Sequence, residues 1–248
     1  MIEAINVSKI FHEREVLKNI NVIFEQGKTN LIIGQSGSGK TVLMKCLVGL
    51  FQIDKGEIRF DGRSFSTISY DEKKKIRQEI GMLFQGGALF DSMNVEENVI
   101  FPLSMFTNMS REEKLERANF CLKRVNLENA NKLFPSELSG GMKKRVAIAR
   151  AISANPRYLF CDEPNSGLDP ATSIVIDNLI SEITQEYQIT TVINTHDMNS
   201  VIEIGDKIAF IYKGNLWWEG DKNSILTSEN KEINEFVYST ELTRRLKK

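Results

Sequence analysis

The sequence contains little cysteine and no long hydrophobic run. Its three cysteines, Cys46, Cys121 and Cys161, are scattered and odd in number, which indicates reduced, mostly buried thiols rather than a disulfide framework. The longest stretch without a charged residue, 98–110, contains a proline and is shorter than the ~20 apolar residues of a membrane-spanning helix. We therefore expect a chain in a reducing compartment that does not cross a membrane by itself.

The sequence also lacks an excess of either charge. Lys and Arg number 32 against 33 Asp and Glu, so the formal net charge of −1 disfavours DNA, RNA or another polyanion as partner. The amino-terminal segment 1–11 already carries Glu3 and Lys9, so we expect folded structure there instead of a signal peptide, and a cytoplasmic protein. With 41% hydrophobic and 26% charged residues, the composition excludes disordered, collagen-like and coiled-coil chains.

Short apolar runs separated by turns make the first hundred residues β-rich, and strands alternate with helices from Leu138 onward. This alternation predicts an α/β fold with a parallel core. We expect one nucleotide-binding domain over 1–248, with a helical insertion at about 100–155 that starts after Pro102, and a carboxy-terminal tail at about 228–248. Expected strands cover 22–24, 31–33, 58–60, 80–84, 158–161 and 189–194, and a helix follows 31–33 over 41–50.

Two helix starts can be read from the sequence. Ser110 and Glu113 fit a capping box, and a buried stripe follows at Leu115, Ala118, Leu122 and Val125. Asp169 and Pro170 supply a cap and a first-turn proline for a helix whose buried positions are Ile176, Leu179, Ile180 and Ile183.

The segment 34–41, GQSGSGKT, matches the complete P-loop pattern between a strand and a helix. The glycines allow consecutive amides to surround an anion, Lys40 neutralises the β and γ phosphates, and the Thr41 hydroxyl can ligate Mg²⁺. The alternative is a flexible loop with an ordinary surface lysine. The expected ATP-binding residues here are Gly34, Gln35, Ser36, Gly37, Ser38, Gly39, Lys40, Thr41 and Val42.

Asp162 and Glu163 end a hydrophobic strand as adjacent carboxylates that point in different directions. We assign Asp162 as a Mg²⁺ ligand and Glu163 as the general base that accepts a proton from the attacking water. The alternative is a strand that simply ends at solvent.

The segment 138–142, LSGGM, opens a helix. This segment has two explanations, a Ser cap after a glycine turn and a second phosphate cradle, and both can hold together. As a second phosphate cradle, Ser139, Gly140 and Gly141 would serve the nucleotide of a facing subunit, which implies a dimer. The expected buried residues of this helix are Met142, Val146 and Ala149, with Lys143, Lys144 and Arg145 elsewhere.

These motifs, in this order and spacing, resemble the ATP-binding subunit of an ABC transporter over essentially the whole chain. The resemblance implies the P-loop NTPase fold of ABC ATPases: a mixed sheet, an amino-terminal antiparallel β part and an α-helical insertion. It implies a transport-coupled ATPase with ATP and Mg²⁺ as cofactors. One departure is Met142, which stands where most relatives carry Gln and lacks the polar contacts of an amide.

The resemblance also implies further site residues. Gln85 corresponds to the glutamine that touches Mg²⁺ and senses the membrane partner, and His196 to the histidine at the γ phosphate. Asp169, in the segment 166–169, corresponds to the residue that communicates between the two sites. Phe11 occupies the place of the aromatic side chain that stacks on adenine; its alternative is a core residue.

The segment 81–99, GMLFQGGALFDSMNVEENV, with the LSGGM ending, is similar to Mla-type phospholipid-trafficking ATPases of Gram-negative bacteria. Residues 162–170 and 194–199 resemble the Bacteroidetes branch of that group. This resemblance implies a homodimer under two permeases, an MCE-domain lipid-binding protein, phospholipid as cargo and a position on the cytoplasmic face of the inner membrane. Residues Gly86, Gly87, Ala88, Leu89 and Phe90 would form the groove for a coupling helix, with core packing as the alternative for Leu89 and Phe90.

Other functions remain open from the sequence. The alternatives are the ATPase of a small-solute importer, such as one for amino acids, and a soluble ABC ATPase outside transport. The basic end of the chain, with Arg244, Arg245, Lys247 and Lys248, fits either a solvated helix end or a contact with anionic membrane. We expect Trp217 and Trp218, after a turn at 213–215, to cover the core as part of a hairpin.

Overall fold

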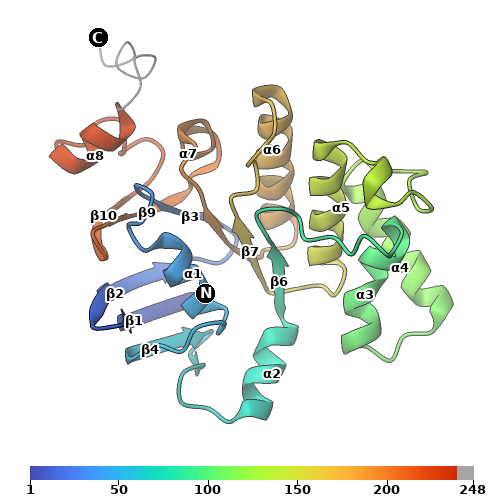
Figure 1. Cartoon of the computed structure of the whole chain (residues 1–248), viewed down its shortest axis with the longest axis horizontal. Coiled ribbons are helices and arrows are strands. Elements are labelled where there is room, and N and C mark those ends of the chain that lie inside the picture. The colour runs from blue at the N-terminus through green and yellow to red at the C-terminus, as the bar shows by residue number, and fades with distance from the viewer. Residues whose placement is uncertain (239–248) are drawn as a thin grey trace.

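The structure, a computed structural model, describes residues 1–238 and contains two β-sheets surrounded by helices (Figure 1). The smaller, antiparallel sheet has the strand order β2-β1-β4-β5. Its strands are β1 (Ile2–Phe11), β2 (Arg14–Phe24), β4 (Lys55–Phe60) and β5 (Arg63–Ser64). The predicted strand at 22–24 is the end of the longer β2, in which buried and exposed residues alternate because only one face meets the core.

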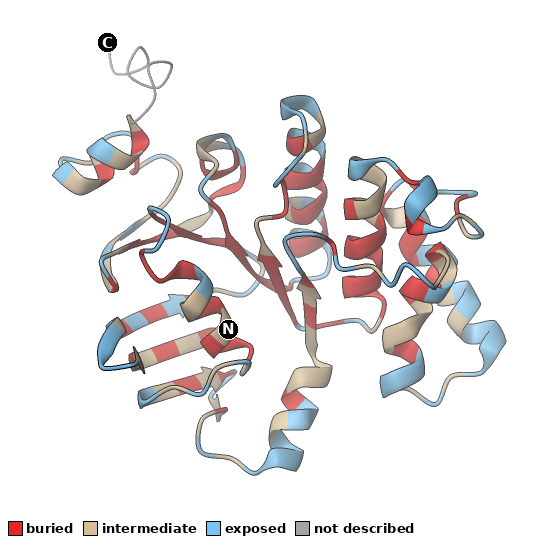
Figure 2. Cartoon of the chain, viewed as in Figure 1, coloured by how far each residue is buried: buried red, intermediate tan, exposed pale blue. Residues whose placement is uncertain are grey.

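The larger sheet has the order β10-β9-β3-β8-β7-β6, and only β10 runs antiparallel to its neighbour. Its strands are β3 (Thr29–Ile33), β6 (Ile80–Leu83), β7 (Tyr158–Asp162), β8 (Thr190–Asn194), β9 (Lys207–Tyr212) and β10 (Asn215–Gly220). Every residue of β3 and β8 is buried, and Figure 2 shows these central strands in red. The carboxyl ends of β3, β7 and β8 therefore meet at one edge of the sheet, which confirms the predicted mixed α/β fold.

Eight α-helices are present in residues 1–238. They are α1 (Lys40–Leu47), α2 (Tyr70–Gln78), α3 (Val95–Phe106), α4 (Arg111–Arg124), α5 (Gly140–Ile152), α6 (Pro170–Glu186), α7 (Met198–Ile204) and α8 (Lys231–Val237), with a 3₁₀ turn at Pro135–Glu137. The first of them is shorter than predicted. It ends at Leu47 and not at residue 50, because Gly49 adopts a left-handed conformation with φ of 74°.

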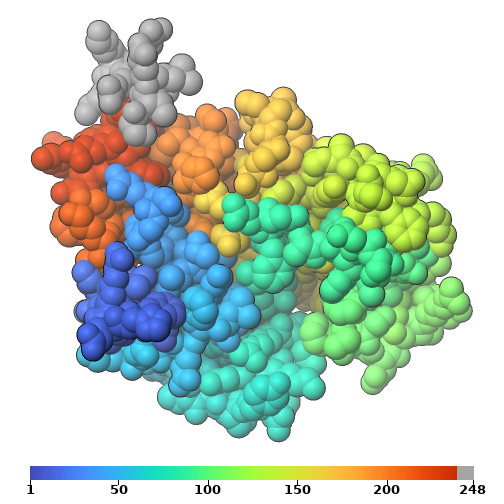
Figure 3. All heavy atoms as spheres, viewed as in Figure 1, coloured from blue at the N-terminus to red at the C-terminus, as the bar shows by residue number. Residues whose placement is uncertain are grey.

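Helices α3, α4 and α5 pack on one another at one side of the molecule, opposite the antiparallel sheet (Figure 3). The helical region starts earlier than expected, because a capping box of Asn94 and Glu97 begins α3 at Val95 and Pro102 lies inside that helix. The capping box of Ser110 is confirmed. Leu115, predicted to be buried, is 37% exposed, so the buried stripe of α4 starts at Ala118.

One charged residue of α5 is also not where the sequence placed it. Lys144 is buried, with 5% of its surface exposed, whereas the pattern put it away from the packed side. The amphipathic pattern misplaces it because its ammonium group finds backbone oxygens inside the protein, and polar partners of this kind are invisible in a hydrophobic periodicity.

The carboxy-terminal region beyond residue 228 is more than a tail. Ile233 and Val237 of α8 are buried, and Phe236 packs against Phe210 of β9. The four basic residues near the end, Arg244, Arg245, Lys247 and Lys248, lie outside the described residues. Within residues 1–238, no helix is both long enough and apolar enough to span a bilayer.

All three cysteines are buried and free, as expected. Burial raises the pKa of the Cys46 thiol to about 12 and that of the Cys121 thiol to about 11. These thiols are therefore protonated and unreactive at neutral pH. The predicted hairpin is confirmed too, since β9 and β10 pair around the turn at 213–214. Trp218 packs against the core as expected, whereas Trp217 is 45% exposed.

Candidate nucleotide site

The loop between β3 and α1 curls tightly, and two of its glycines explain how. Gly34 has φ of +145°, and a Cβ there would lie 2.2 Å from the carbonyl oxygen of Ile211. Gly39, at the start of α1, has φ of +112°. Neither position accommodates an ordinary side chain, so the glycines of the motif are required by the path of the backbone.

The amino terminus of α1 has no capping side chain and no acidic residue in its first turn. The other seven described α-helices each have a side chain that accepts a hydrogen bond at this position, such as Ser69 of α2 or Asn94 of α3. The first amides of α1 thus keep their hydrogen-bonding capacity, and the helix dipole makes this end attractive to an anion. The α1 terminus is built to receive a phosphate group.

Lys40 lies inside this loop with 7% of its surface exposed. Its ammonium donates to the carbonyl oxygens of Gly34, at 2.8 Å, and Gln35, at 3.1 Å. Burial lowers the pKa of Lys40, while the negative charges of Glu163 and Asp162 act in the opposite direction. Lys40 therefore brings a positive charge to the point where the loop, α1 and the two carboxylates meet.

Asp162 and Thr41 are joined through Asn194, which ends β8. The Asn194 amide donates to Asp162 Oδ1 at 2.6 Å and to Thr41 Oγ1 at 3.2 Å. Its own Oδ1 is buried and has no hydrogen-bond partner within residues 1–238. Carboxylate, hydroxyl and amide oxygens are the ligand types that Mg²⁺ prefers, so these side chains fit the ion that the sequence predicts.

Glu163 and His196 face each other across the end of the sheet. The Nδ1 atom of His196 lies 2.9 Å from Glu163 Oε1, and the His196 side chain is 71% exposed. Glu163 has φ of 49°, a left-handed conformation that costs a non-glycine residue roughly 1 kcal/mol or more. Asp162 and Glu163 make different contacts, since Asp162 accepts from Asn194 whereas Glu163 meets His196.

Most of the predicted residues meet in one cavity of about 800 Å³. Predicted residues that line it are Gly34, Gln35, Ser36, Gly37, Gly39, Lys40, Thr41, Val42, Gln85, Asp162, Glu163 and His196. Ser38 lies beneath it, and its hydroxyl is buried without a hydrogen-bond partner. The cavity also contains three residues that the sequence did not indicate, namely Val16 of β2 and Glu235 and Phe236 of α8.

Besides Ser38 and Phe11, four predicted residues at the starts of α5 and α6 do not line this cavity, namely Ser139, Gly140, Gly141 and Asp169. The Ser139 hydroxyl accepts from the Met142 amide, so the capping role is confirmed. Asp169 caps α6 by accepting from the Thr172 amide and hydroxyl, and these bonds lower the pKa of its carboxyl. The Met142 side chain packs on the core in place of making polar contacts.

Phe11 also lies outside this set of lining residues. It is half-buried near the end of the β1–β2 hairpin, where its ring meets that of Phe51 edge-on with centroids 5.3 Å apart, and Lys9 lies over it. Packing against Phe51 fixes the orientation of the Phe11 ring.

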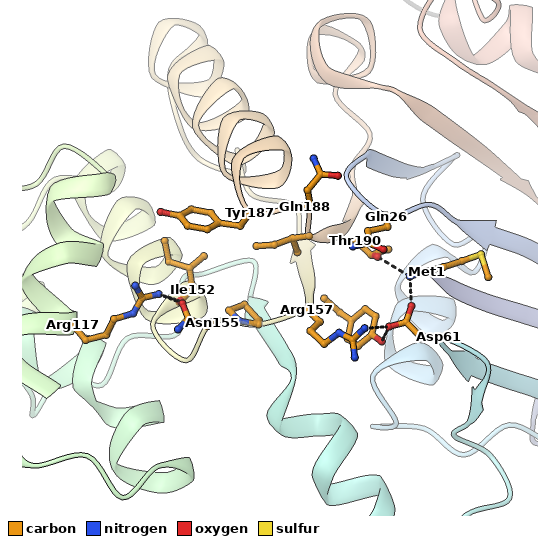
Figure 4. A pocket seen from close by; sticks show the side chains of 13 residues that line it. Met1, Gln26, Asp61, Arg117, Ile152, Asn155, Arg157, Tyr187, Gln188 and Thr190 are labelled. Atoms are coloured by element: carbon orange, nitrogen blue, oxygen red, sulfur yellow. Dashed lines mark hydrogen bonds and ion pairs between the residues drawn. The ribbon is translucent and has the colours of Figure 1, made fainter. Parts of the chain in front are cut away.

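A second cavity, of about 420 Å³, lies at the opposite, amino-terminal ends of β7 and β8 (Figure 4). Its two arginines already have partners, since Arg117 bonds Asn155 and Arg157 pairs with Asp61 at 2.7 Å. None of the motif residues reaches it. The candidate site is therefore the cavity at the carboxyl ends of the strands, where ligands of open α/β sheets bind.

Comparison with known proteins agrees with this geometry. A family model described as "ABC transporter" matches residues 17–166. The methionine import ATP-binding protein MetN of Clostridium tetani is 38% identical over 98% of this chain and 76% of its own length. The probable ribonucleotide transport ATP-binding protein mkl of Mycobacterium leprae is 34% identical over 95% of this chain and 68% of its own.

Two solved structures share the fold. The ATP-binding cassette MJ0796, in a dimeric post-hydrolysis state bound to ADP and Pi, superposes with a TM-score of 0.81 at 34% identity, covering 90% of this chain and 99% of the other. The cbiO1 protein of Clostridium perfringens, part of the ABC transporter complex cbiONQ, reaches 0.86 at 28% identity, covering 100% and 98%.

Proposed function

This chain belongs to the ABC transporter ATP-binding family and hydrolyses ATP, and from that premise we propose that two copies of it drive a membrane permease. The observation that carries the proposal is the uncapped amino terminus of α1, which opens into the same cavity as Glu163 and His196. An anion-binding terminus beside a carboxylate base is the arrangement that hydrolysis of a phosphoanhydride needs.

Within this site, the loop amides and Lys40 hold the β and γ phosphates. Glu163 accepts the proton of the attacking water, and His196, which contacts Glu163, orients the base and reaches the γ phosphate. Thr41, Asp162 and Gln85 would hold Mg²⁺, which would neutralise phosphate charge. Phe11 stacks on the adenine ring.

The dimer is supported by the position of the second cradle. Ser139, Gly140 and Gly141 carry a helix amino terminus and glycine amides, yet they lie outside the cavity that contains Lys40. A facing copy brings its own α1 terminus to this cradle, so that each nucleotide lies between two chains and Asp169 lies between the two sites. The structural relative MJ0796 is described as dimeric, in agreement with this arrangement.

We propose that the permease docks in an apolar groove of about 400 Å³. It lies between β6, α3 and α5 and is lined by Gln78, Ile80, Gly81, Met82, Phe84, Ala88, Phe90, Phe101, Pro102, Phe106, Arg150, Ala151, Ala154 and Pro156. Of the five residues expected here, Ala88 and Phe90 line the groove, whereas Leu89 packs into the core. Phe84, Phe90 and Phe106 are 42%, 39% and 46% exposed, as a surface awaiting an apolar partner helix would be.

The cargo proposed first is a small solute of the amino-acid type. Relatives from Clostridium tetani and Rhizobium johnstonii, 38% and 37% identical, are named for methionine import, and none of the relatives reported above is named for lipid. In such a system the chain sits on the cytoplasmic face of the membrane through its permease.

Phospholipid trafficking with an MCE-domain protein is the second candidate. It rests on the segment 81–99 and the LSGGM ending, whose residues resemble Mla-type ATPases. The two candidates differ in partner and cargo and share the ATPase chemistry described above.

A pull-down separates the candidates. The tagged chain is extracted from native membranes in mild detergent, and mass spectrometry identifies co-purifying proteins and lipids. A multispanning permease with a solute-binding protein supports import, while a permease with an MCE-domain protein and bound phospholipid establishes the second candidate. Recovery of soluble partners alone would contradict both.

A further inference from the structure

Two buried cations of α5 hold the loops that carry Gln85 and Glu163. Lys144 donates to the carbonyl oxygen of Gln85 at 2.5 Å and to that of Glu163 at 3.4 Å. Arg150, two turns further along α5, donates to the carbonyl oxygens of Gly87, at 2.6 Å, and Ala88, at 2.7 Å. Helix α5, which Ser139 caps, therefore forms hydrogen bonds to both loops.

Three of the four carbonyl groups that these cations bind belong to residues with left-handed backbone conformations. Glu163 and Ala88 are non-glycine residues with φ of 49° and 46°, and Gly87 has φ of 77°. Left-handed conformations persist only where surrounding bonds enforce them. Among residues 1–238, the Glu163 carbonyl accepts from two donors, the Ser166 amide at 3.2 Å and the Lys144 ammonium at 3.4 Å, so Lys144 is one of the two groups that hold it.

Burying the Lys144 ammonium costs free energy, because a buried cation loses its hydration. Lys144 is 5% exposed, its partners are neutral carbonyls, and no carboxylate within residues 1–238 forms an ion pair with it. Burial lowers the pKa of Lys144, and the negative charges of Glu163 and Asp162 oppose this change. A buried cation without an ion-pair partner is retained where its position matters.

We propose that Lys144 is a positioning residue for ATP hydrolysis, linking the helix that reads the facing nucleotide to Gln85 and Glu163 of its own site. This inference rests on the proposed roles of Gln85 and Glu163. When the facing nucleotide engages Ser139, any shift of α5 moves both carbonyls, because one ammonium holds them. Lys144 thereby connects one nucleotide of the dimer with hydrolysis of the other.

Two substitutions separate the bonds from the charge. Lys144→Met keeps a buried chain of similar length and removes both hydrogen bonds, and Lys144→Gln keeps donors for the two carbonyls without the charge. Lys143→Met, on the same helix and half-buried, is the matched control. The ATPase rate of each purified chain is measured against ATP concentration with Mg²⁺, and thermal unfolding checks the fold.

For Lys144→Met we expect kcat to fall roughly ten-fold or more while KM for ATP stays within about three-fold, because loop placement affects hydrolysis more than binding. Lys144→Gln should recover at least half of the lost rate, and Lys143→Met should match the native chain. A folded Lys144→Met with native kcat overturns the inference, as does a change confined to KM. If Lys144→Met fails to fold, the test is Lys144→Gln. Near-native kcat and KM for Lys144→Gln support the hydrogen-bonding role. A loss of ATPase activity as large as that of an unfolded chain overturns it.

Glu163→Gln in the same assay tells the two failures apart. If it hydrolyses ATP at the native rate, the proposed role of Glu163 is wrong, and the inference about Lys144 falls with it. If Glu163→Gln is inactive and Lys144→Met is native-like, only the role of Lys144 is wrong.

Discussion

The imidazole Nδ1 of His196 lies 2.9 Å from Oε1 of Glu163, although the two residues follow different strands and are 33 positions apart. Glu163 follows β7 and His196 follows β8, and the parallel pairing of these strands brings their carboxyl ends together. Because His196 is exposed and Glu163 is largely covered, the pair presents its histidine to the cavity. This contact fixes the Glu163 carboxylate relative to His196.

Replacing Glu163 by Gln removes the proton acceptor and keeps the shape of the side chain. We expect kcat for ATP to fall about 100-fold or more, in line with the loss of a general base. ATP binding should persist, so that the variant accumulates as a closed dimer with Mg-ATP. Size-exclusion chromatography measures this, and a variant that stays monomeric with saturating nucleotide contradicts the facing-site arrangement.

Replacing Lys40 by Ala removes the cation inside the phosphate loop. Hydrogen bonds to charged groups contribute about 1.5–3 kcal/mol, which corresponds to roughly a 10- to 100-fold rise in Kd for ATP. Equilibrium binding of a fluorescent ATP analogue checks this. The exposed Lys123→Ala of α4 serves as control and should bind normally; unchanged affinity of Lys40→Ala would exclude the loop as the phosphate site.

Asn194 orients two of the proposed Mg²⁺ ligands, so its truncation should act through the metal. We expect Asn194→Ala to raise the Mg²⁺ concentration for half-maximal ATPase activity roughly ten-fold, as the loss of a ligand-orienting partner does. The test is a Mg²⁺ titration at saturating ATP. A normal titration curve in a folded variant would show that Asp162 and Thr41 do not need this bridge.

Asp177 of α6 gives the stability of the protein a pH dependence. It is 2% exposed, and in the part of the chain that the structure describes its Oδ1 has no hydrogen-bond partner. Burial raises the pKa of Asp177 from 3.8 to about 6, and hydrogen bonds from Ser200 and Asn165 oppose this rise. The folded chain thus binds this proton more tightly than the unfolded chain. Its stabilising contribution is complete below about pH 4 and is lost as the pH rises through about 6.

Asp177→Asn should therefore increase the free energy of unfolding at pH 7.5 by about 1 to 3 kcal/mol, since one pKa unit corresponds to about 1.4 kcal/mol. The gain should shrink as the pH falls from 6 to 4. An amide at this position also offers a donor to Asn165 Oδ1, which is buried and has no partner. Urea unfolding at several pH values measures the effect, and a gain that is independent of pH would assign it to the hydrogen bond alone.

Local sequence was enough to predict several features of this protein. Glycine spacing around Lys40 predicted the curled loop, because the backbone path there excludes a Cβ at Gly34. Ser110 and Asp169 predicted the starts of α4 and α6, because capping depends on neighbours a few residues away. Resemblance of the ordered motifs to a family supplied the fold and the ATPase activity.

Other features depended on contacts between distant residues. Asn194 bridges Asp162 and Thr41 only because β8 lies beside β7 and behind α1; its one sequence signal is a polar residue at the end of a buried strand. Lys144 looked like a surface residue of an amphipathic helix until the structure placed two carbonyl oxygens beside its ammonium. Nothing in the local sequence indicated that Phe236 of α8 would line the cavity that contains Lys40. Sequence determines what a segment can form by itself, whereas partners for buried polar groups exist only once the chain has brought distant elements together.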